Sequence, residues 1–215
     1  MKPCRSITLL ELLIATLLLS IIVLGLGNID LFSRFHVISS DRRAKIDNEA
    51  SLALGHMGKE VAKAIGNEIS NGADTVLDYN SKIGDDNALR IYIDASRNGQ
   101  RDAEGTDRWI AYRFTAGHGN PGGRYQIWYC PNCENKPCAN CVPQWGDANN
   151  IIARNISLFT PSKPVNASNR LNKSYITIEI QACWDPAQTS YSCGTPNNPS
   201  VTMKANMNMP TVSTN

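Results

Sequence analysis

An uninterrupted apolar segment near the N-terminus constrains this chain more than any other feature. Residues 7–27, ITLLELLIATLLLSIIVLGLG, contain no Lys, Arg or Asp and a single acidic residue, Glu11. A helix of this length spans about 30 Å, the thickness of the hydrocarbon core of a bilayer. Lys2 and Arg5 precede the segment. The positive-inside rule therefore predicts that the first residues stay in the cytoplasm and that the rest crosses the membrane.

Three interpretations of this segment compete. It can be a signal anchor that tethers an exported domain, or it can be a cleaved secretory signal. The cleaved signal is disfavoured because the run is longer than the roughly 7–15 apolar residues of such signals, and no A-x-A site follows it. The third interpretation depends on Glu11. A carboxylate in a membrane helix costs about 2.5–3.5 kcal/mol to insert, so it usually has a partner and a function.

The residues around Glu11 resemble those of a known family. Residues 6–12, SITLLEL, follow a short basic leader. They are similar to the class III signal of type IV pilins and pseudopilins, whose usual form is Gly-Phe-Thr-Leu-Leu-Glu-Leu. Ser6 stands in place of the usual Gly, and Ile7 in place of the usual Phe or Met. The resemblance implies that a prepilin peptidase cuts between Ser6 and Ile7 and methylates the new N-terminus, while the apolar run stays on the protein.

The same resemblance implies a role for Glu11 in assembly. After cleavage Ile7 carries a cationic amine, and the Glu11 carboxylate of a neighbouring subunit would pair with it, which offsets the burial of both charges in hydrocarbon. The alternative is a protonated carboxylate that is merely tolerated. Loss of residues 1–6 would leave 19 Lys and Arg against 19 Asp and Glu, with six of the seven cysteines. This neutral balance gives no reason to expect nucleic-acid binding.

The helix is expected to continue beyond the membrane. Residues 28–71 lack proline, and Asn71-Gly72 is the expected end of the helix. The apolar residues at mostly helical spacing are Phe32, Phe35, Ile38, Ile46, Leu54, Met57, Val61, Ile65 and Ile69. Residues 53–70 also resemble, more loosely, the region in which J-type pseudopilins and PilW-type minor pilins end this helix. His56 within it is expected to be a surface residue rather than a ligand.

After residue 72 the pattern changes to short segments with β character. The expected strands are Thr75–Tyr79, Leu89–Asp94, Trp109–Phe114, Tyr125–Tyr129, Ala153–Phe159 and Tyr175–Cys183, with a short edge strand near Val201–Lys204. The predicted fold class is α+β and pilin-like: a long, partly transmembrane N-terminal helix packed on a small antiparallel sheet. The predicted parts are a leader (1–6), a transmembrane half-helix (7–27), an extramembrane half-helix (28–71) and a head (72–215).

A cysteine-rich loop at residues 130–141 is the densest group of reactive side chains. Its two C-x-x-C units consist of Cys130, Cys133, Cys138 and Cys141. Four thiolates suit zinc or an iron–sulfur cluster, but zinc ribbons usually place about 15–20 residues between such units. Disulfides are favoured, because an exported head lies in an oxidising compartment. Cys183 and Cys193 would then close a further loop, while the overall connectivity stays open.

A segment rich in oxygen donors follows the second expected strand. Its candidate ligands are Asp94, Ser96, Asn98, Gln100 and Asp102. The spacing matches most of a calcium-binding loop, but Gly105 replaces the bidentate Glu at the twelfth position. PilW-type minor pilins carry a similar loop before a W-[VI]-x-Y-R strand, and residues 109–113, WIAYR, resemble that strand. A polar hairpin loop is favoured over a calcium site.

No Ser/His/Asp or Cys/His nucleophile set is legible, and the resemblance implies an assembly subunit rather than an enzyme. The favoured function is a minor pilin or pseudopilin of a type IV pilus or a type II secretion system, PilW-type before J-type. The implied location is the inner membrane, with the head in the periplasm. The implied partners are other pilin or pseudopilin subunits, the prepilin peptidase and the inner-membrane assembly platform. The alternatives are an anchored metal-binding or redox protein that uses the tetracysteine loop, and a tip adhesin or DNA-uptake pilin. No cofactor is expected beyond the calcium alternative.

Overall fold

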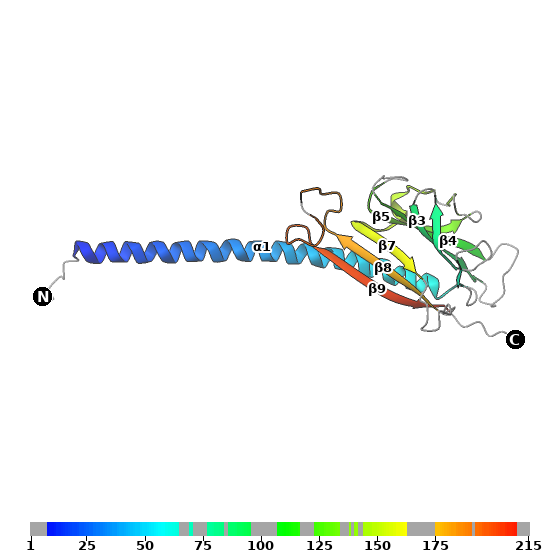
Figure 1. Ribbon diagram of the computed structural model, residues 1–215, viewed down its shortest axis with the longest axis horizontal. Helices are drawn as coiled ribbons and strands as arrows, with labels where there is room; N and C mark the ends of the chain where they lie inside the picture. Colours follow the sequence, from blue (N-terminus) through cyan, green and yellow to red (C-terminus); the bar gives the residue numbers. More distant parts are fainter. Residues whose placement is uncertain are drawn as a thin grey trace. The chain divides into compact units, whose positions relative to one another are not determined.

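The computed structural model of the protein describes residues 8–64, 69–70, 77–83, 86–95, 107–116, 123–133, 138, 140–141, 144–162, 175–190 and 192–209. The chain divides into two compact units, residues 1–41 and residues 42–215. The described elements are α1 (Leu9–Val61), β1 (Ile69–Ser70), β2 (Leu77–Ile83), β3 (Asp86–Ile93), β4 (Arg108–Thr115), β5 (Gln126–Cys133), the 3₁₀ turn η1 (Ala148–Asn150), β6 (Ile151–Ala153), β7 (Ile156–Ser162), β8 (Tyr175–Cys183) and β9 (Ser200–Asn208) (Figure 1).

The described part of the first unit is helical from Leu9 onward. It contains a stretch that is long and apolar enough to cross a membrane, by length and composition. The helix runs without interruption through Gly25 and Gly27. Its large apolar side chains are exposed, unlike those of a core helix.

The second unit begins within α1, and here one face of the helix is buried. The buried residues are Ile46, Ala50, Ala53, Met57 and Val61, at spacings of three and four. This is the period of a single helix face. The sequence predicted Ile46, Met57 and Val61 on this face but not the two alanines. Both alanines are fully buried on this face.

Helix α1 ends at Val61, earlier than the predicted end at residue 71. The backbone N–H groups of Lys63 and Ala64 turn back to the carbonyls of residues 60 and 61, at 3.0 and 3.1 Å. Ala64 then forms a β-bridge with Ile93, and the Asp94 N–H donates to the Lys63 carbonyl at 3.0 Å. Pairing with β3 thus replaces the next helical turn, and Ile69, predicted on the helix face, lies in β1.

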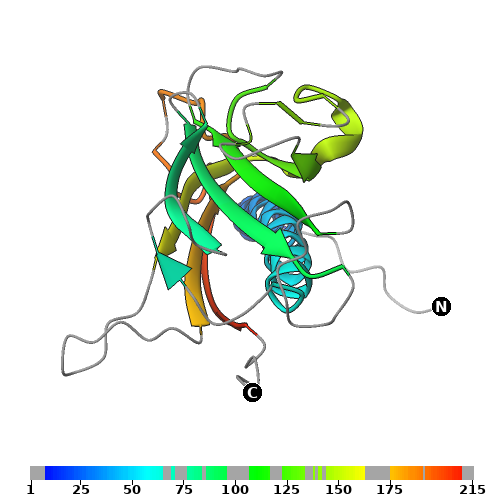
Figure 2. The ribbon, with the colours of Figure 1, turned by 90° about the vertical axis from the view of Figure 1, so that its right-hand side faces the viewer.

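Two sheets, rather than the single sheet predicted, form the β part of the described residues. Sheet A has the strand order β1-β2-β3-β4-β5-β6, and sheet B has the order β7-β8-β9. All pairs are antiparallel except β1–β2, which is parallel. Figure 2 shows the cyan part of α1 alongside both sheets. The predicted α+β layout is therefore confirmed, but its strands form two sheets instead of one.

The division between the sheets falls inside one predicted strand. Residues 153–159 were expected to be continuous, but β6 ends at Ala153 and β7 starts at Ile156. Asn155 between them has a φ of 59°. Asparagine adopts this left-handed conformation more readily than most residues, so it supplies the break. The two parts of the predicted strand therefore belong to different sheets, β6 to sheet A and β7 to sheet B.

Strand β9 is longer than the edge strand predicted at Val201–Lys204. All nine of its residues pair with β8, from Ser200 opposite Cys183 to Asn208 opposite Tyr175. Its composition has few strong strand formers, which shortened the prediction. Val201, Met203, Ala205 and Met207 nevertheless alternate along one face and pack on the core.

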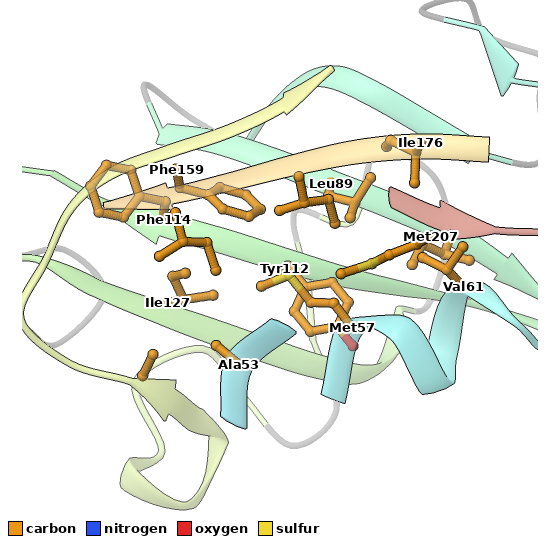
Figure 3. Close-up of a cluster of buried hydrophobic side chains, with 14 of the residues drawn as sticks. Ala53, Met57, Val61, Leu89, Tyr112, Phe114, Ile127, Phe159, Ile176 and Met207 are labelled. Carbon is orange, nitrogen blue, oxygen red and sulfur yellow. The ribbon is translucent and has the colours of Figure 1, made fainter. Parts of the chain in front are cut away.

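The main core joins α1 to both sheets. Figure 3 shows Met57 and Val61 of α1 among Leu89 and Tyr112 of sheet A and Met207 of sheet B. The predicted alternation of β8 is confirmed, because Ile176, Ile178, Ile180 and Ala182 are all fully buried in this cluster. The helix face is therefore the common surface on which the head is built.

Substitution at the centre of this face tests its importance. Met57→Ala is expected to lower the free energy of unfolding by about 2–5 kcal/mol, because Met57 is fully buried. Leu52→Ala is the matched control on the same helix, since Leu52 is 62% exposed. It is expected to change stability by under about 0.5 kcal/mol. Urea denaturation of detergent-solubilised protein measures both, and equal losses would contradict the assignment of the face.

Candidate functional site: the apolar helix and the disulfide-bonded loops

Glu11 lies in the first turn of α1 and closes a capping box with Thr8. The Thr8 backbone N–H and hydroxyl both donate to Glu11 Oε2 at 3.0 Å. In return, the Glu11 N–H donates to Thr8 Oγ1 at 3.3 Å. The exchange satisfies backbone donors that a helix start leaves without partners. The T-x-x-E spacing that signals this motif was present in the sequence but was not used to place the start of the helix.

The carboxylate of Glu11 is thus held beside the first turn of the helix, next to the point where the predicted processing junction joins it. Ser6 and Ile7, which form that junction, lie outside the described residues. The predicted pairing of Glu11 with another subunit remains a prediction. The structure adds a competing partner within the same chain, the Thr8 N–H.

Apolar side chains are exposed along the first unit well beyond one membrane thickness. The large ones are Leu9, Leu10, Leu12, Leu13, Ile14, Leu17, Leu18, Leu19, Ile21, Ile22, Val23, Leu24, Leu26, Ile29, Leu31, Phe32, Phe35, Val37 and Ile38. A contiguous apolar surface of this extent marks a membrane or protein interaction site. Its polar members include an i,i+4 ion pair, Arg34 with Asp30 at 3.0 Å. This surface is the first candidate functional site.

The cysteine-rich loop contains two nested disulfides. Cys130 bonds to Cys141, and Cys133 bonds to Cys138 within the same loop. The sulfur atoms of Cys130 and Cys133, which belong to different bridges, lie 3.7 Å apart. All four residues are buried, at 5% exposure or less. These sulfurs are bonded to one another, so the four-thiolate metal site considered from the sequence would first require reduction of both bridges.

This loop covers a second, smaller core on the face of sheet A that is opposite the main core. Its members are Ile83, Ala88, Tyr92, Trp109, Ala111 and the four cysteines, with Trp145 packed against them. The Trp145 indole N–H donates to the Cys138 carbonyl at 3.3 Å. The disulfides therefore act as apolar packing groups as well as cross-links.

A buried ion pair lies next to Trp145. Arg113 Nε donates to Asp86 Oδ2 at 2.6 Å, and the Asp86 side chain is fully buried. The Arg113 guanidinium carbon lies 5.8 Å from the centre of the Trp145 ring, a distance at which the cation is attracted to the ring face. The sequence analysis did not find this pair, because only strand register brings residues 86 and 113 together.

A third disulfide, Cys183–Cys193, closes the loop that follows β8, as the sequence predicted. Trp184 in this loop packs under two cations of α1, with Arg42 at 5.3 Å and Lys45 at 5.8 Å from the ring centre. Arg42 also donates to the Asn197 carbonyl at 2.9 Å. The loop is therefore fixed to the helix by cation–π contacts and a hydrogen bond.

Only part of the predicted calcium-binding segment is described. Asp94 follows β3 directly, while Ser96, Asn98, Gln100 and Asp102 lie outside the described residues. Asp107 Oδ1 accepts the Ala95 N–H at 3.1 Å and closes the base of the segment. The described residues contain no group of three or more His, Cys, Asp or Glu side chains placed to hold a metal ion. The calcium alternative remains a prediction.

His56 is half-buried rather than fully exposed on the helix surface. Its Nδ1 lies 2.9 Å from the Tyr112 hydroxyl, and its ring packs edge-on against Tyr129 at 4.6 Å between centres. Burial lowers the pKa of His56; Glu60 opposes this effect, and Lys63 and Lys59 add to it. Burial also raises the pKa of Tyr129 to about 12. The lowered pKa favours the uncharged imidazole, and the tautomer of that ring decides whether Nδ1 donates to the Tyr112 hydroxyl or accepts from it.

Comparisons with models of known families, with curated proteins and with solved structures found no match. The two candidate sites therefore have to be interpreted from their own residues.

The stability of the head is expected to depend on the titration of His56 as the pH falls below about 6.5. Because the folded state lowers the pKa of His56, unfolded chains bind its proton more readily. The contribution is present above the unfolded pKa of about 6.5 and is lost as the pH falls through the folded value. His56→Asn keeps a side chain that can hydrogen-bond to Tyr112 but cannot titrate. The urea midpoint should fall less with pH in this variant than in the wild type; equal slopes would contradict the assignment.

Removal of the third disulfide is expected to destabilise the head. The double variant Cys183→Ser with Cys193→Ser should lose about 3 kcal/mol, the value for a ring of this size. Urea denaturation under non-reducing conditions measures the loss. Ser192→Ala, beside the bridge, is the control and should leave stability within about 0.5 kcal/mol. A double variant as stable as the wild type would show that packing of Trp184 alone holds the loop.

Proposed function

We propose that this chain is a fibre subunit of the pilin-like class, a minor pilin or pseudopilin that works by assembly. The observation that carries the proposal is the exposed apolar surface of α1 between Leu9 and Ile38, on the helix that also forms the base of the head. A free chain cannot leave such a surface in water. A membrane, and then a bundle of equivalent helices, would cover it.

Two further features support the proposal. The SITLLEL signal at residues 6–12 resembles that of prepilins, and the helix begins within it at Leu9. Three disulfides fit a head that folds outside the cytoplasm, because such bonds persist in oxidising compartments. The proposed location is the inner membrane with the head in the periplasm. The proposed partners are other subunits, the prepilin peptidase and the assembly platform.

Within this class we favour a PilW-type minor pilin over a J-type pseudopilin. The WIAYR segment at residues 109–113 lies in β4, at the centre of sheet A. The Asp- and Gly-rich segment of the resemblance precedes β4 directly. A major pilin is disfavoured, because the head carries irregular, disulfide-bonded loops where abundant subunits need simple lateral packing.

In the proposal, the Glu11 carboxylate changes its hydrogen-bond partner when the subunit enters the fibre. In the single chain its carboxylate accepts from Thr8, which anchors the start of the helix. In the fibre it would accept from the cationic amine of Ile7 on a neighbouring subunit. In hydrocarbon the cationic amine would compensate the charge of the Glu11 carboxylate, whereas the Thr8 N–H and hydroxyl carry no opposite charge. The exchange would set the axial position of one subunit against the next.

Two substitutions separate assembly from helix capping. Glu11→Gln keeps the capping box, in which Gln also serves, but removes the charge. It is expected to abolish incorporation into fibres, measured by recovery of the protein with sheared pili or pseudopili, while its level in the membrane stays normal. Thr8→Ala is the matched control, because it removes the capping hydroxyl and keeps the charge. It is expected to incorporate at close to the wild-type level.

The opposite pattern would overturn the proposal. If Glu11→Gln incorporates normally and Thr8→Ala does not, Glu11 serves the helix start alone. If both variants and the wild type stay in the membrane fraction under conditions in which fibres form, the chain is an anchored protein rather than a subunit.

A further inference from the structure

Two disulfides lie in contact in the cysteine-rich loop. We propose that Cys130, Cys133, Cys138 and Cys141 form a thiol–disulfide exchange site, at which a small thiol converts the nested bridges into two C-x-x-C bridges, Cys130–Cys133 and Cys138–Cys141. The contact between the sulfurs of Cys130 and Cys133, at 3.7 Å, carries the proposal. These two atoms are not bonded in the structure, and they are the pair that the exchange would join.

A β-bulge creates this contact. Residues three apart in a regular strand point to opposite faces. Here Cys130 pairs with Ala111 and Cys133 pairs with Trp109, so three steps on β5 match two steps on β4. The extra residue turns both sulfurs to the same face of sheet A, inside the second core. The fold therefore places sulfurs from different bridges side by side.

The exchange balances without a net oxidant or reductant. A small thiolate attacks Cys141, breaks the Cys130–Cys141 bond and leaves the electron pair on Cys130. The Cys130 thiolate attacks Cys133, forms Cys130–Cys133 and releases Cys138 as a thiolate. Cys138 then attacks the mixed disulfide at Cys141, forms Cys138–Cys141 and expels the small thiolate. Each step makes one S–S bond and breaks one, so the small thiol is recovered.

The two forms differ in what they hold together. The nested bridges tie β5 to the returning chain, where Cys141 forms a β-bridge with Cys133 and the Cys138 carbonyl accepts from Trp145. With the C-x-x-C bridges, no disulfide joins β5 to that returning segment. The exchange would therefore release the cover of the second core, and with it the contact of Trp145 with Arg113.

The sequence offers a direct readout of the two forms. Glu134 is the only glutamate between the two C-x-x-C units, so cleavage after glutamate gives peptides 105–134 and 135–179. The nested form leaves these peptides cross-linked, and the C-x-x-C form lets them separate. Digestion at pH 4, after alkylation of free thiols, keeps exchange slow because the thiols are protonated. The leader cysteine is replaced by Cys4→Ser in every sample.

Two single variants provide the test. In Cys138→Ser the free thiol is Cys133, which faces Cys130, so we expect Cys130–Cys133 to form, Cys141 to be alkylated and the peptides to separate. In Cys133→Ser that bond cannot form, so any separated peptide 105–134 should carry an alkylated Cys130 and no internal disulfide. An intact Cys130–Cys141 bond with alkylated Cys133 in Cys138→Ser overturns the proposal.

The chain with both bridges intact gives a second measurement that does not depend on the folding of a variant. Incubation with glutathione at pH 8, before quenching, should convert part of the cross-linked species to separated peptides that carry internal disulfides. Peptides that stay fully cross-linked after incubation would also overturn the proposal. Both experiments are independent of fibre assembly.

Discussion

The burial of one face of α1 is the contact on which the head depends. Ile46, Ala50, Ala53, Met57 and Val61 belong to a single core together with residues of both sheets. The two alanines and Met57 are fully buried in this core. The face ends where Ala64 begins to pair with β3, and the chain leaves the helix at that point.

The outer part of the head relies on a different kind of interaction. On the far face of sheet A, a small core is closed by disulfides, by the Arg113–Asp86 pair and by Trp145. Beyond sheet B, the Cys183–Cys193 loop is held on α1 through Trp184. Irregular loops bury little apolar area by themselves. Disulfides and cation–π contacts compensate for this small buried area, because they hold each loop against an element of the main core.

The sequence was sufficient for features that depend on local periodicity. It predicted β8 with its actual bounds, and it placed β3, β4 and β5 within a few residues, because alternation is strong in each. The sequence did not predict features that depend on contacts between residues distant in the chain. The end of α1 at Val61 follows from pairing with β3, and the split at Asn155 follows from the choice between two sheets. The nested connectivity could not be derived, because spacing alone leaves several pairings open. Tyr112, the hydrogen-bond partner of His56, lies on β4 and could not be predicted from local sequence either.

The central claim is that the mature protein begins at Ile7 and keeps the apolar helix. Intact mass and N-terminal sequencing of the protein recovered from its native membrane test this claim most directly. The account predicts a chain that lacks residues 1–6 and starts at N-methylated Ile7. Its mass should equal that of the chain with its six cysteines oxidised to three disulfides. A chain that still starts at Met1, or one that starts after residue 27, would contradict it.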